Sequence, residues 1–512
     1  MDREKVTVLQ VPDLTLVIDI GKSHAKLLLV DANGQVVERH GRDNAPVISQ
    51  LGYPALDIAG LTQWMQDTLA VSPNTRRSGH AIVSTHGAAF VALGDDGLAW
   101  APLDYEFEGC TQPGSALDVA YRQACDPFAE TFSPDLPMGL NAARQLYWLQ
   151  HTHPQAWAQT RTLLPYPQYW SWWLSGVASS EVSSLGCHTQ LWSVQAGKFS
   201  KLAQAQGWAD LFAPLQSAWQ VLGPVRPVLA DALGLPHSCQ VHVGVHDSNA
   251  CLARYLGSQG KKQSLTLVSS GTWTVLMAPG APAANLQARR DMLGNVSVLG
   301  QPTPTARFMG GREFSALLDG APADLGTDEH LQQLLQTQAF AVPAFANQGG
   351  PFMTQQGYLL RNGQPCALQT LTGAERSALA ALYCAQMTAW LVHCLRPETQ
   401  SDGDKPCAVD ESALEDCRLV VEGPLASNRL YMGLLQSLLT RYTCLASVDE
   451  LEGTARGAWL LSRWSNNPGT SGAVNPPSFL QAVQPLHLAG LQDYHQRWTA
   501  LVAGLELCAT TP

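Results

Sequence analysis

Two similar segments, about half a chain apart, constrain the fold of this 512-residue protein more than any other feature of its sequence. Each consists of an apolar strand rich in β-branched residues, a small polar turn with glycine, and a second apolar strand, which is typical of a β-hairpin. The segments span residues 14–31 and 265–277, and both begin with Leu-Thr-Leu-Val. Because each segment opens one half of the chain, the pattern predicts a duplicated domain.

The polar turns of the two hairpins are candidate phosphate-binding sites. Gly21, Lys22 and Ser23 form the first turn, and Gly271 and Thr272 form the second. Glycine lets the backbone approach a ligand closely, and exposed turn N–H groups form a concavity that binds anions. Neither turn has the spacing of a Walker A loop. Two such turns that face each other would hold a nucleotide phosphate chain from both sides.

Length and composition narrow the class of protein. At about 150 residues per domain, the chain is long enough for two to four domains. Hydrophobic residues make up 46% of the chain and charged residues 14%, as in a well-packed globular enzyme. The net charge of -11, without a clustered Lys/Arg stripe, argues against a general nucleic-acid binder. We see no apolar run of the ~18 residues that a membrane helix needs.

The 12 cysteines are scattered without a C-x-x-C pair, so we expect reduced thiols in a cytoplasmic protein.

Strands and helices alternate along both halves, which predicts α/β domains with mixed sheets. In the first half we expect strands at 13–30 (a hairpin), 35–40, 81–83, 88–93, 98–100 and 241–245, and helices at 56–69, 142–150 and 248–256. In the second half we expect helices at 311–318, 374–395, 430–439 and 452–462, and strands at 419–422 and 444–446. We expect loops at 279–282, 302–304 and 401–410, and a turn at 424–428. A linker-like stretch at 257–262 is the expected domain boundary.

Two aspartates stand where catalytic or metal-binding groups are expected. Asp19 ends a buried strand before the first turn, where a carboxylate can hold Mg²⁺ through water; the alternative is a cap on the turn. Asp247 ends the strand at 241–245, and strand ends collect catalytic groups in α/β folds. Phosphoryl transfer to an alcohol needs a carboxylate that accepts the hydroxyl proton. The alternative is that Asp247, or Ser248, only caps the following helix.

Several polar groups beside apolar strands are candidate ligands. His86, Gly87 and Asp104 could supply donors and acceptors for sugar hydroxyls, although a structural role is equally open for each. His246 either binds substrate or fills space. The segment from Gly423 to Asn428 follows a strand and opens a helix, which suits an approaching base or ribose. Aromatic residues gather at 166–173, where core packing is favoured over stacking on a sugar.

Taken in order, these motifs resemble the FGGY carbohydrate kinases, and the resemblance spans nearly the whole chain. It implies an α/β fold of two actin-like (ribonuclease-H-like) ATPase domains, over residues 1–258 and 259–512, with a cleft between them. The segments that carry it are Asp19-Ile20-Gly21-Lys22-Ser23, Thr85-His86-Gly87, the strand and helix at 163–176, Gly244-Val245-His246-Asp247, Ser270-Gly271-Thr272-Trp273, Gly423 to Asn428, and Glu452-Gly453 with Gly457-Ala458.

The resemblance also implies a function: transfer of phosphate from ATP, with Mg²⁺, to a hydroxyl of a small sugar. The motif style is nearest to rhamnulose and fuculose kinases, so we expect a ketose or deoxyketose such as L-rhamnulose, L-fuculose or xylulose. Asp247 would be the catalytic base and Asp19 would organise the metal. The implied nucleotide ligands are Gly21, Lys22, Ser23, Gly271, Thr272, Gly423 and Asn428, and the implied sugar ligands are His86, Gly87, Asp104, His246 and Asp247. We expect no nucleic-acid or membrane partner, and a homodimer stays open.

The chain departs from the family pattern at three places. One is the segment 305–313, which lies near the point where rhamnulose-type kinases have a Thr-Asn-Glu stretch. The adenosine loop of the family usually has three glycines, where this chain has Glu422, Gly423 and Pro424, and a proline has no N–H to donate. The usual Asp-x-Arg after the first sugar segment appears as Asp104-Tyr105-Glu106. Two other classes therefore stay open: an actin-like ATPase or sugar-sensing protein without kinase activity, and a glycosidase that uses a pair of carboxylates.

Overall fold

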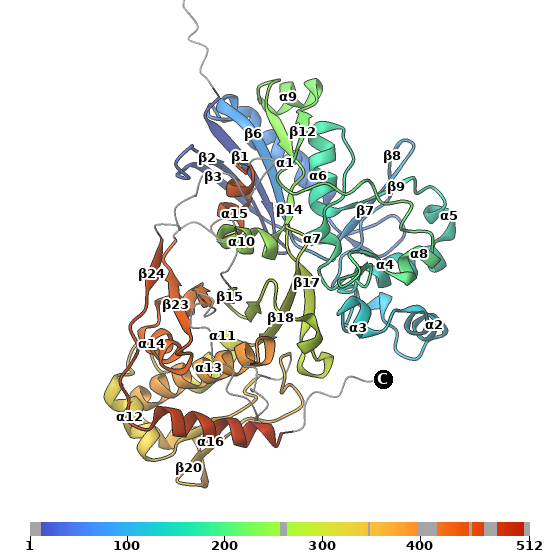
Figure 1. The fold of residues 1–512 in the computed structure, drawn as a ribbon. Helices are drawn as coiled ribbons and strands as arrows, with labels where there is room; N and C mark the ends of the chain where they lie inside the picture. The colour runs from blue at the N-terminus through green and yellow to red at the C-terminus, as the bar shows by residue number, and fades with distance from the viewer. Residues whose placement is uncertain are drawn as a thin grey trace, which may run out of the picture.

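The computed structural model describes residues 12–256, 264–346, 349–397, 417–449, 453–464 and 479–505. Two seven-stranded mixed sheets, one in each half of the chain, form its framework (Figure 1). The first sheet has the order β12 (Val221–Pro224), β13 (Gln240–His242), β6 (Ser78–Thr85), β1 (Leu14–Ile20), β2 (His24–Val30) and β3 (Val36–Asp43), with β14 (Val245–His246) also paired to β6. The second has the order β17 (Leu293–Val296), β18 (Pro302–Phe308), β16 (Thr274–Met277), β15 (Ser264–Ser270), β22 (Cys417–Glu422), β23 (Tyr442–Ser447) and β24 (Leu480–Ala482).

The two sheets share one pairing pattern. In the first, β1 runs antiparallel to β2 and parallel to β6, and β6 runs parallel to β13. In the second, β15 runs antiparallel to β16 and parallel to β22, and β22 runs parallel to β23. An antiparallel strand closes each sheet beyond these, β12 in the first and β24 in the second. The two predicted hairpins and the duplicated α/β topology are confirmed.

One face of the first sheet is covered by α1 (Ile58–Val71), α6 (Tyr166–Ser175) and α9 (Pro227–Leu233). Asp57 caps the start of α1, because its side chain accepts from the Gly60 N–H, and the helix buries Leu61 and Met65 at helical spacing. Trp170 and Trp173 of α6 lie in the same core cluster. The aromatic cluster of α6 therefore packs the core, as the sequence favoured.

Two helices lie between the two sheets: α10 (Asp247–Leu256) and α15 (Gly453–Leu461) (Figure 1). A Cβ on Gly457 of α15 would lie 1.7 Å from the Ala250 carbonyl oxygen of α10, so only glycine allows this crossing. The core cluster around them joins Val17 of the first sheet to Leu267 of the second. Since α15 also contacts β1 and β6, a helix from the second half completes the core of the first.

The second half is built around α13 (Gly373–Leu395), which a Thr372/Glu375 capping box begins. It packs against α11 (Gly310–Leu318), α12 (Asp328–Gln336) and α14 (Arg429–Leu438). By length and composition α13 could cross a membrane, but 83% of its most apolar window is buried within the protein. It is thus the core helix of this half. α16 (Leu491–Ala503) packs nearby against β19 (Phe340–Val342).

Both halves contain further short helices and strands outside the two large sheets. In the first half they are β4 (Val47–Ile48), β5 (Pro54–Ala55), β7 (Phe90–Gly94), β8 (Gly97–Trp100), α2 (Ala116–Ala124), α3 (Phe128–Thr131), α4 (Ala142–Thr152), α5 (Pro154–Trp157), β9 (Thr162–Pro165), α7 (Val182–Leu185), β10 (Trp192–Ser193), β11 (Lys198–Phe199) and α8 (Lys201–Ala205). In the second half they are β20 (Tyr358–Arg361) and β21 (Gln364–Cys366). The ten cysteines of the described ranges are free thiols, in agreement with the expectation.

Three local predictions need correction. The strand expected at 241–245 is two strands, because Gly244 takes a φ of +87° where its Cβ would meet the Val83 carbonyl oxygen at 2.7 Å. The following helix begins at Asp247, one residue before the expected Ser248. The segment 302–304 is not a loop but part of β18, since a proline carbonyl still accepts a hydrogen bond: Pro304 accepts from Ala278. The stretches 257–262 and 401–410, expected as linker and loop, lie outside the described residues.

Candidate active site

Three parallel strands bring the main candidates to one edge of the first sheet. Asp19 of β1 pairs with Ser84 of β6, His86 directly follows β6, and Asp247 directly follows β14. Because the carboxyl ends of parallel strands meet at the same edge, these side chains converge there. Burial raises the pKa of the Cys251 thiol, and the charges of Glu422, Asp247 and Asp19 raise it further.

Asp247 is held by one carboxylate oxygen only. Its Oδ1 lies 3.1 Å from His246 Nε2 and accepts from the Ser248 N–H at 2.6 Å and the Ser248 hydroxyl at 3.2 Å. No donor within the described ranges contacts Oδ2, and 31% of the side chain is exposed. Burial raises the pKa of Asp247, but its interactions with His246, and after them those with His86 and the Ser248 N–H, outweigh burial and keep the pKa below its ordinary value. The carboxylate is therefore ionised, oriented and open on one side.

His246 is buried against Asp247, and its tautomer follows from its partners. Asn249 Nδ2 lies 3.3 Å from His246 Nδ1, and an amide nitrogen can only donate, so Nδ1 accepts and Nε2 carries the proton toward Asp247. Gly87 makes this packing possible, because a Cβ there would lie 2.7 Å from His246 Nε2. Two predicted sugar ligands, Gly87 and His246, are thus in contact with each other and support Asp247.

A buried carboxylate behind His246 has no strong signal in the sequence. Glu181 begins α7 and accepts from the N–H groups of Ser183 at 2.9 Å and Ser184 at 3.2 Å. Burial raises its pKa to about 7, although these hydrogen bonds and the nearby His246 lower it. In the sequence, a single Glu among serines indicates an ordinary surface position or a helix cap. The sequence therefore did not identify Glu181 as a buried carboxylate near the site.

In both polar turns the glycine amide closes the hairpin, although the first turn is one residue longer than the second. The Gly21 N–H donates to the His24 carbonyl at 2.9 Å, and the Gly271 N–H donates to the Trp273 carbonyl at 2.8 Å. The N–H groups of Lys22 and Thr272, next along each turn, have no acceptor in the part of the chain that the structure describes. In both turns the first amide closes the hairpin and later amides are available for an anion.

A pocket of about 750 Å³ opens beside the second turn, a size that suits a nucleoside. The Gly311 N–H of α11 donates to the Thr272 carbonyl at 3.3 Å, which fixes this helix against the turn. The pocket joins that turn to the end of β22 and the start of α14. Its lining includes Gly271, Thr272, Gly311, Arg312, Phe314, Gly326, Pro424, Leu425 and Asn428.

The loop after β22 is clamped onto the second hairpin. Gly423 has a φ of +81°, and a Cβ there would lie 1.9 Å from the Ser270 carbonyl oxygen. The Ser270 hydroxyl accepts from the Leu425 N–H at 3.0 Å and donates to the Glu422 carbonyl at 2.6 Å. Asn428 caps α14, because its side chain accepts from the Tyr431 N–H at 2.9 Å.

The Glu422 side chain points away from the pocket. Its carboxylate lies 2.7 Å from Arg254 Nη1 of α10 and accepts from the Tyr255 hydroxyl at 3.2 Å. Glu422 does not line the pocket, whereas Pro424 does. The pocket is therefore open even though residue 422 is not glycine. Of the two departures in this loop, only Pro424, which has no N–H to donate, would contact a bound nucleotide.

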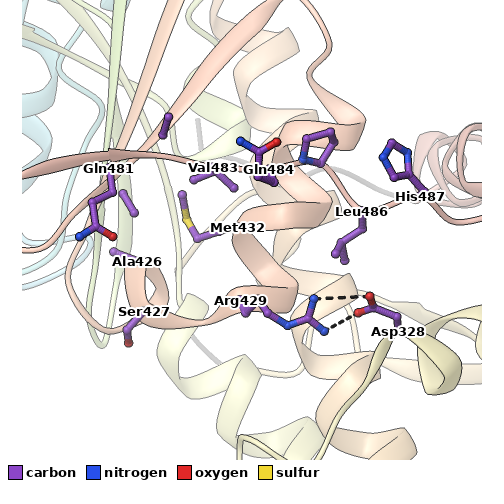
Figure 2. Close-up of a pocket in the computed structure, with 13 residues that line it drawn as sticks. Asp328, Ala426, Ser427, Arg429, Met432, Gln481, Val483, Gln484, Leu486 and His487 are labelled. Carbon is purple, nitrogen blue, oxygen red and sulfur yellow. Dashed lines mark hydrogen bonds and ion pairs between the residues drawn. The ribbon is translucent and has the colours of Figure 1, made fainter.

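Figure 2 shows residues that line a second pocket, of about 460 Å³. Ser427 and Arg429 line both pockets, and the ion pair of Arg429 with Asp328 fastens the start of α14 to α12. Neither Asp19 nor Asp247 lines it. The same is true of the 750 Å³ pocket, so both pockets are lined by the second half and leave the two carboxylates outside their lining.

The predicted sugar segment contacts the first turn. Lys22 Nζ lies 2.5 Å from Asp104 Oδ2, so the lysine side chain reaches Asp104, away from the backbone amides of its own turn. His86 lies beside them, packed by Tyr105 and Tyr166 with ring centroids 5.4 and 5.2 Å away. Burial lowers the pKa of His86, which keeps it neutral at pH 7. Its Nδ1 donates to the Gly87 carbonyl at 3.0 Å, which leaves Nε2 as an acceptor.

The carboxylates suit Mg²⁺ only together with other ligands. Among the described residues no group of three His, Cys, Asp or Glu side chains could hold a metal ion. Mg²⁺ prefers oxygen ligands and is usually bound by one or two carboxylates with waters and substrate phosphates. The buried Asp19 carboxylate at the sheet edge fits that pattern, with the phosphates supplied by a nucleotide.

Two family models match this chain. "FGGY family of carbohydrate kinases, N-terminal domain" matches residues 135–253, and "Carbohydrate kinase FGGY, C-terminal domain" matches residues 262–404. L-fuculokinase from Salmonella typhi is 26% identical over 276 residues, which cover 52% of this chain and 56% of that protein. The chain thus spans little more than half the length of the curated relatives it matches.

Solved structures match over nearly the whole chain. A carbohydrate kinase from Novosphingobium aromaticivorans is 33% identical with a TM-score of 0.80, over 96% of this chain and 99% of that one. Xylulose kinase from Rhodospirillum rubrum is 16% identical with a TM-score of 0.69, over 96% of this chain and 98% of that one. At such identity the second match bears on the fold alone.

Proposed function

The chain belongs to the FGGY family of carbohydrate kinases, and on this premise we propose that it transfers the γ-phosphate of ATP to a hydroxyl of a small sugar. It has the family's two-domain actin-like fold. The observation that carries the proposal is the Asp247 carboxylate, which is anchored through Oδ1 and open at Oδ2.

In the proposed reaction, Asp247 Oδ2 accepts the proton of the sugar hydroxyl as the sugar oxygen attacks the γ-phosphorus. The bond between this phosphorus and the β–γ bridging oxygen breaks, and ADP leaves. Because His246 and Ser248 hold Oδ1, the carboxylate needs no reorientation to meet the hydroxyl. Bound Mg²⁺, held through Asp19 and water, would neutralise charge on the phosphates.

The nucleotide is proposed to lie in the 750 Å³ pocket of the second half. Gly271 and Thr272, with the backbone amides of Gly21 to Ser23 in the first turn, would hold its phosphates, and Gly423 and Asn428 would shape the adenosine side. Support comes from the unused amides of both turns and from Gly423, whose missing Cβ lets the loop pack on the hairpin. The Leu425 amide is satisfied by Ser270, so the loop would bind by shape more than by backbone hydrogen bonds.

The sugar is proposed to bind at His86 and Asp104, beside Asp247. Curated relatives are L-fuculokinases, and solved structures of the same fold include xylulose kinases, so a ketose or deoxyketose is the proposed substrate. The alternative function is a sensor that binds nucleotide and does not transfer phosphate, and its support was the altered adenosine loop. Glu422 turns away from the nucleotide pocket, which removes part of that support.

The test is a screen for ADP release with L-fuculose, L-rhamnulose, L-fucose, L-rhamnose, D-xylulose and D-gluconate, each with magnesium and ATP. A kinase forms a phosphorylated sugar in equal amount to ADP, which ³¹P NMR of the product mixture measures. A sensor would bind nucleotide and form no sugar phosphate. Nucleotide binding without any sugar phosphate across the screen would contradict the proposed function.

A further inference from the structure

We propose that Lys22 belongs to the sugar site: with Asp104 and Asn44 it forms a subsite for one hydroxyl group of a neutral sugar. The inference rests on the proposed kinase function and narrows its substrate class. It also changes the expected role of Lys22, whose place in the first polar turn predicts a phosphate ligand.

The Lys22 side chain is held on the sugar side of its turn. Its Nζ lies 2.5 Å from Asp104 Oδ2 and 3.3 Å from Glu106 Oε2, and it lies 5.4 Å from the centre of the Tyr105 ring. The Asp104 side chain is only 2% exposed, so this charged hydrogen bond is shielded from solvent. To reach a phosphate, the lysine would have to leave a nearly buried carboxylate unpaired, which is unfavourable.

A small cavity lies beside this pair and has room for one hydroxyl. It measures about 20 Å³, which is close to the space that one water molecule occupies. Lys22, Asn44, His86, Asp104 and Tyr166 line it. Lys22 can donate there, and Asp104 can accept, so the lining suits a group that both donates and accepts.

Asn44 supplies an independent indication of a ligand. Its Nδ2 donates to the Gly21 carbonyl at 2.9 Å, and its N–H donates to the Ser23 carbonyl at 2.8 Å, so the side chain is fixed against the turn. Its Oδ1 is buried and has no donor among the described residues. A buried acceptor of this kind needs a donor, and a sugar hydroxyl would provide one.

The charges of the site favour a neutral sugar over a sugar acid. The carboxylates around the site are those of Asp57, Asp104, Glu106 and Asp247. They outnumber the cations, which are Lys22 and Arg42, the partner of Asp57. His86 adds no positive charge at pH 7. A substrate carboxylate would therefore meet a net negative site, whereas hydroxyl groups can use both the donor and the acceptors.

The decisive variant is Lys22→Met, compared with Lys198→Met, which removes an exposed lysine of the same half. We expect Lys22→Met to raise the KM for the best neutral sugar at least about tenfold, and Lys22→Arg to recover most of that loss. The Kd for a non-hydrolysable ATP analogue with magnesium, measured by calorimetry, should stay within about threefold of wild type. Thermal melting checks that each variant is folded.

The result that overturns the inference is a Kd for the ATP analogue at least about tenfold weaker in Lys22→Met with the sugar KM unchanged, because Lys22 would then serve phosphate. Faster phosphorylation of D-gluconate than of every neutral sugar would overturn it as well. In both cases wild type is still a kinase, so the proposed function survives. A wild-type protein that neither binds the analogue nor phosphorylates any sugar would overturn both.

Discussion

The Nε2 atom of His246 lies 3.1 Å from the Oδ1 atom of Asp247, its neighbour in sequence. The two residues straddle the junction of β14 and α10, where the chain turns from strand to helix. A histidine that donates to one carboxylate oxygen stabilises the ionised form and fixes its direction. The strand-to-helix junction thus provides both the proposed base and the group that tunes it.

Asp247→Asn should lower kcat by about 10²–10⁴, because the amide keeps the size of the carboxylate but cannot accept a proton. The Asn side chain can still accept from the Ser248 N–H, so the thermal melting temperature and nucleotide Kd should stay near wild type. The measurement is kcat on the best sugar. Asp210→Asn, an exposed position in the same half, is the control. If Asp247→Asn kept a tenth or more of wild-type kcat, Asp247 would not be the base.

His246→Phe should change the pH dependence as well as the rate. Burial raises the pKa of Asp247 and His246 holds it down, so without His246 this pKa rises. Because the base must be ionised, the acid limb of the kcat profile should move to higher pH, and kcat at neutral pH should fall by about tenfold or more. A lower kcat with an unshifted acid limb would mean that His246 only fills space.

Glu181→Gln should change how stability depends on pH. Burial raises the pKa of Glu181 from an ordinary value of 4.5 to about 7. A raised pKa gives stabilisation that is fully present below 4.5 and is lost as the pH rises through 7, a loss on the order of 3 kcal/mol. The free energy of unfolding of wild type should therefore decrease relative to Glu181→Gln between about pH 5 and about pH 8. Denaturant titrations at several pH values measure this, and parallel curves would contradict it.

Gly423→Ala should weaken nucleotide binding and destabilise the second half. The new Cβ would lie 1.9 Å from the Ser270 carbonyl oxygen, so the loop must leave the hairpin. Gly280→Ala is the matched control: Gly280 also has a positive φ, +73°, but nothing lies within 4 Å of its Cβ position. Backbone strain costs both variants about 1–3 kcal/mol, so the difference between them isolates the clash. Equal nucleotide Kd values would mean that the loop does not shape the site.

The features that the sequence predicted well are local. Alternating apolar residues around a glycine turn predicted both hairpins, and the duplicated sheet followed from them. The break at Gly244 could not be predicted, since it depends on the approach of Val83 from another strand. Pro304 was misread because a proline in sequence signals a loop, yet its carbonyl pairs normally within β18.

Chain position indicated the candidates at the strand ends, but it could not indicate the distant partners that long side chains contact. Asp19 and Asp247 remain the candidates that strand ends indicated. Lys22 lies in the expected turn, but its four-carbon side chain reaches Asp104, 82 positions along the chain. Asn44 gives no sequence signal, because its unpartnered oxygen exists only once the third strand has folded back on the turn.

The crossing of α10 and α15 has a consequence for biosynthesis. The apolar face that Val17 and Ile82 present is covered in part by Ala458 and Trp459, residues that leave the ribosome hundreds of codons later. In a nascent chain that has produced only the first half, this apolar surface is therefore exposed to aggregation until α15 is synthesised. We expect the isolated first half to need a chaperone, and termination before codon 453 to yield insoluble product even though the whole sugar-side sheet has been translated.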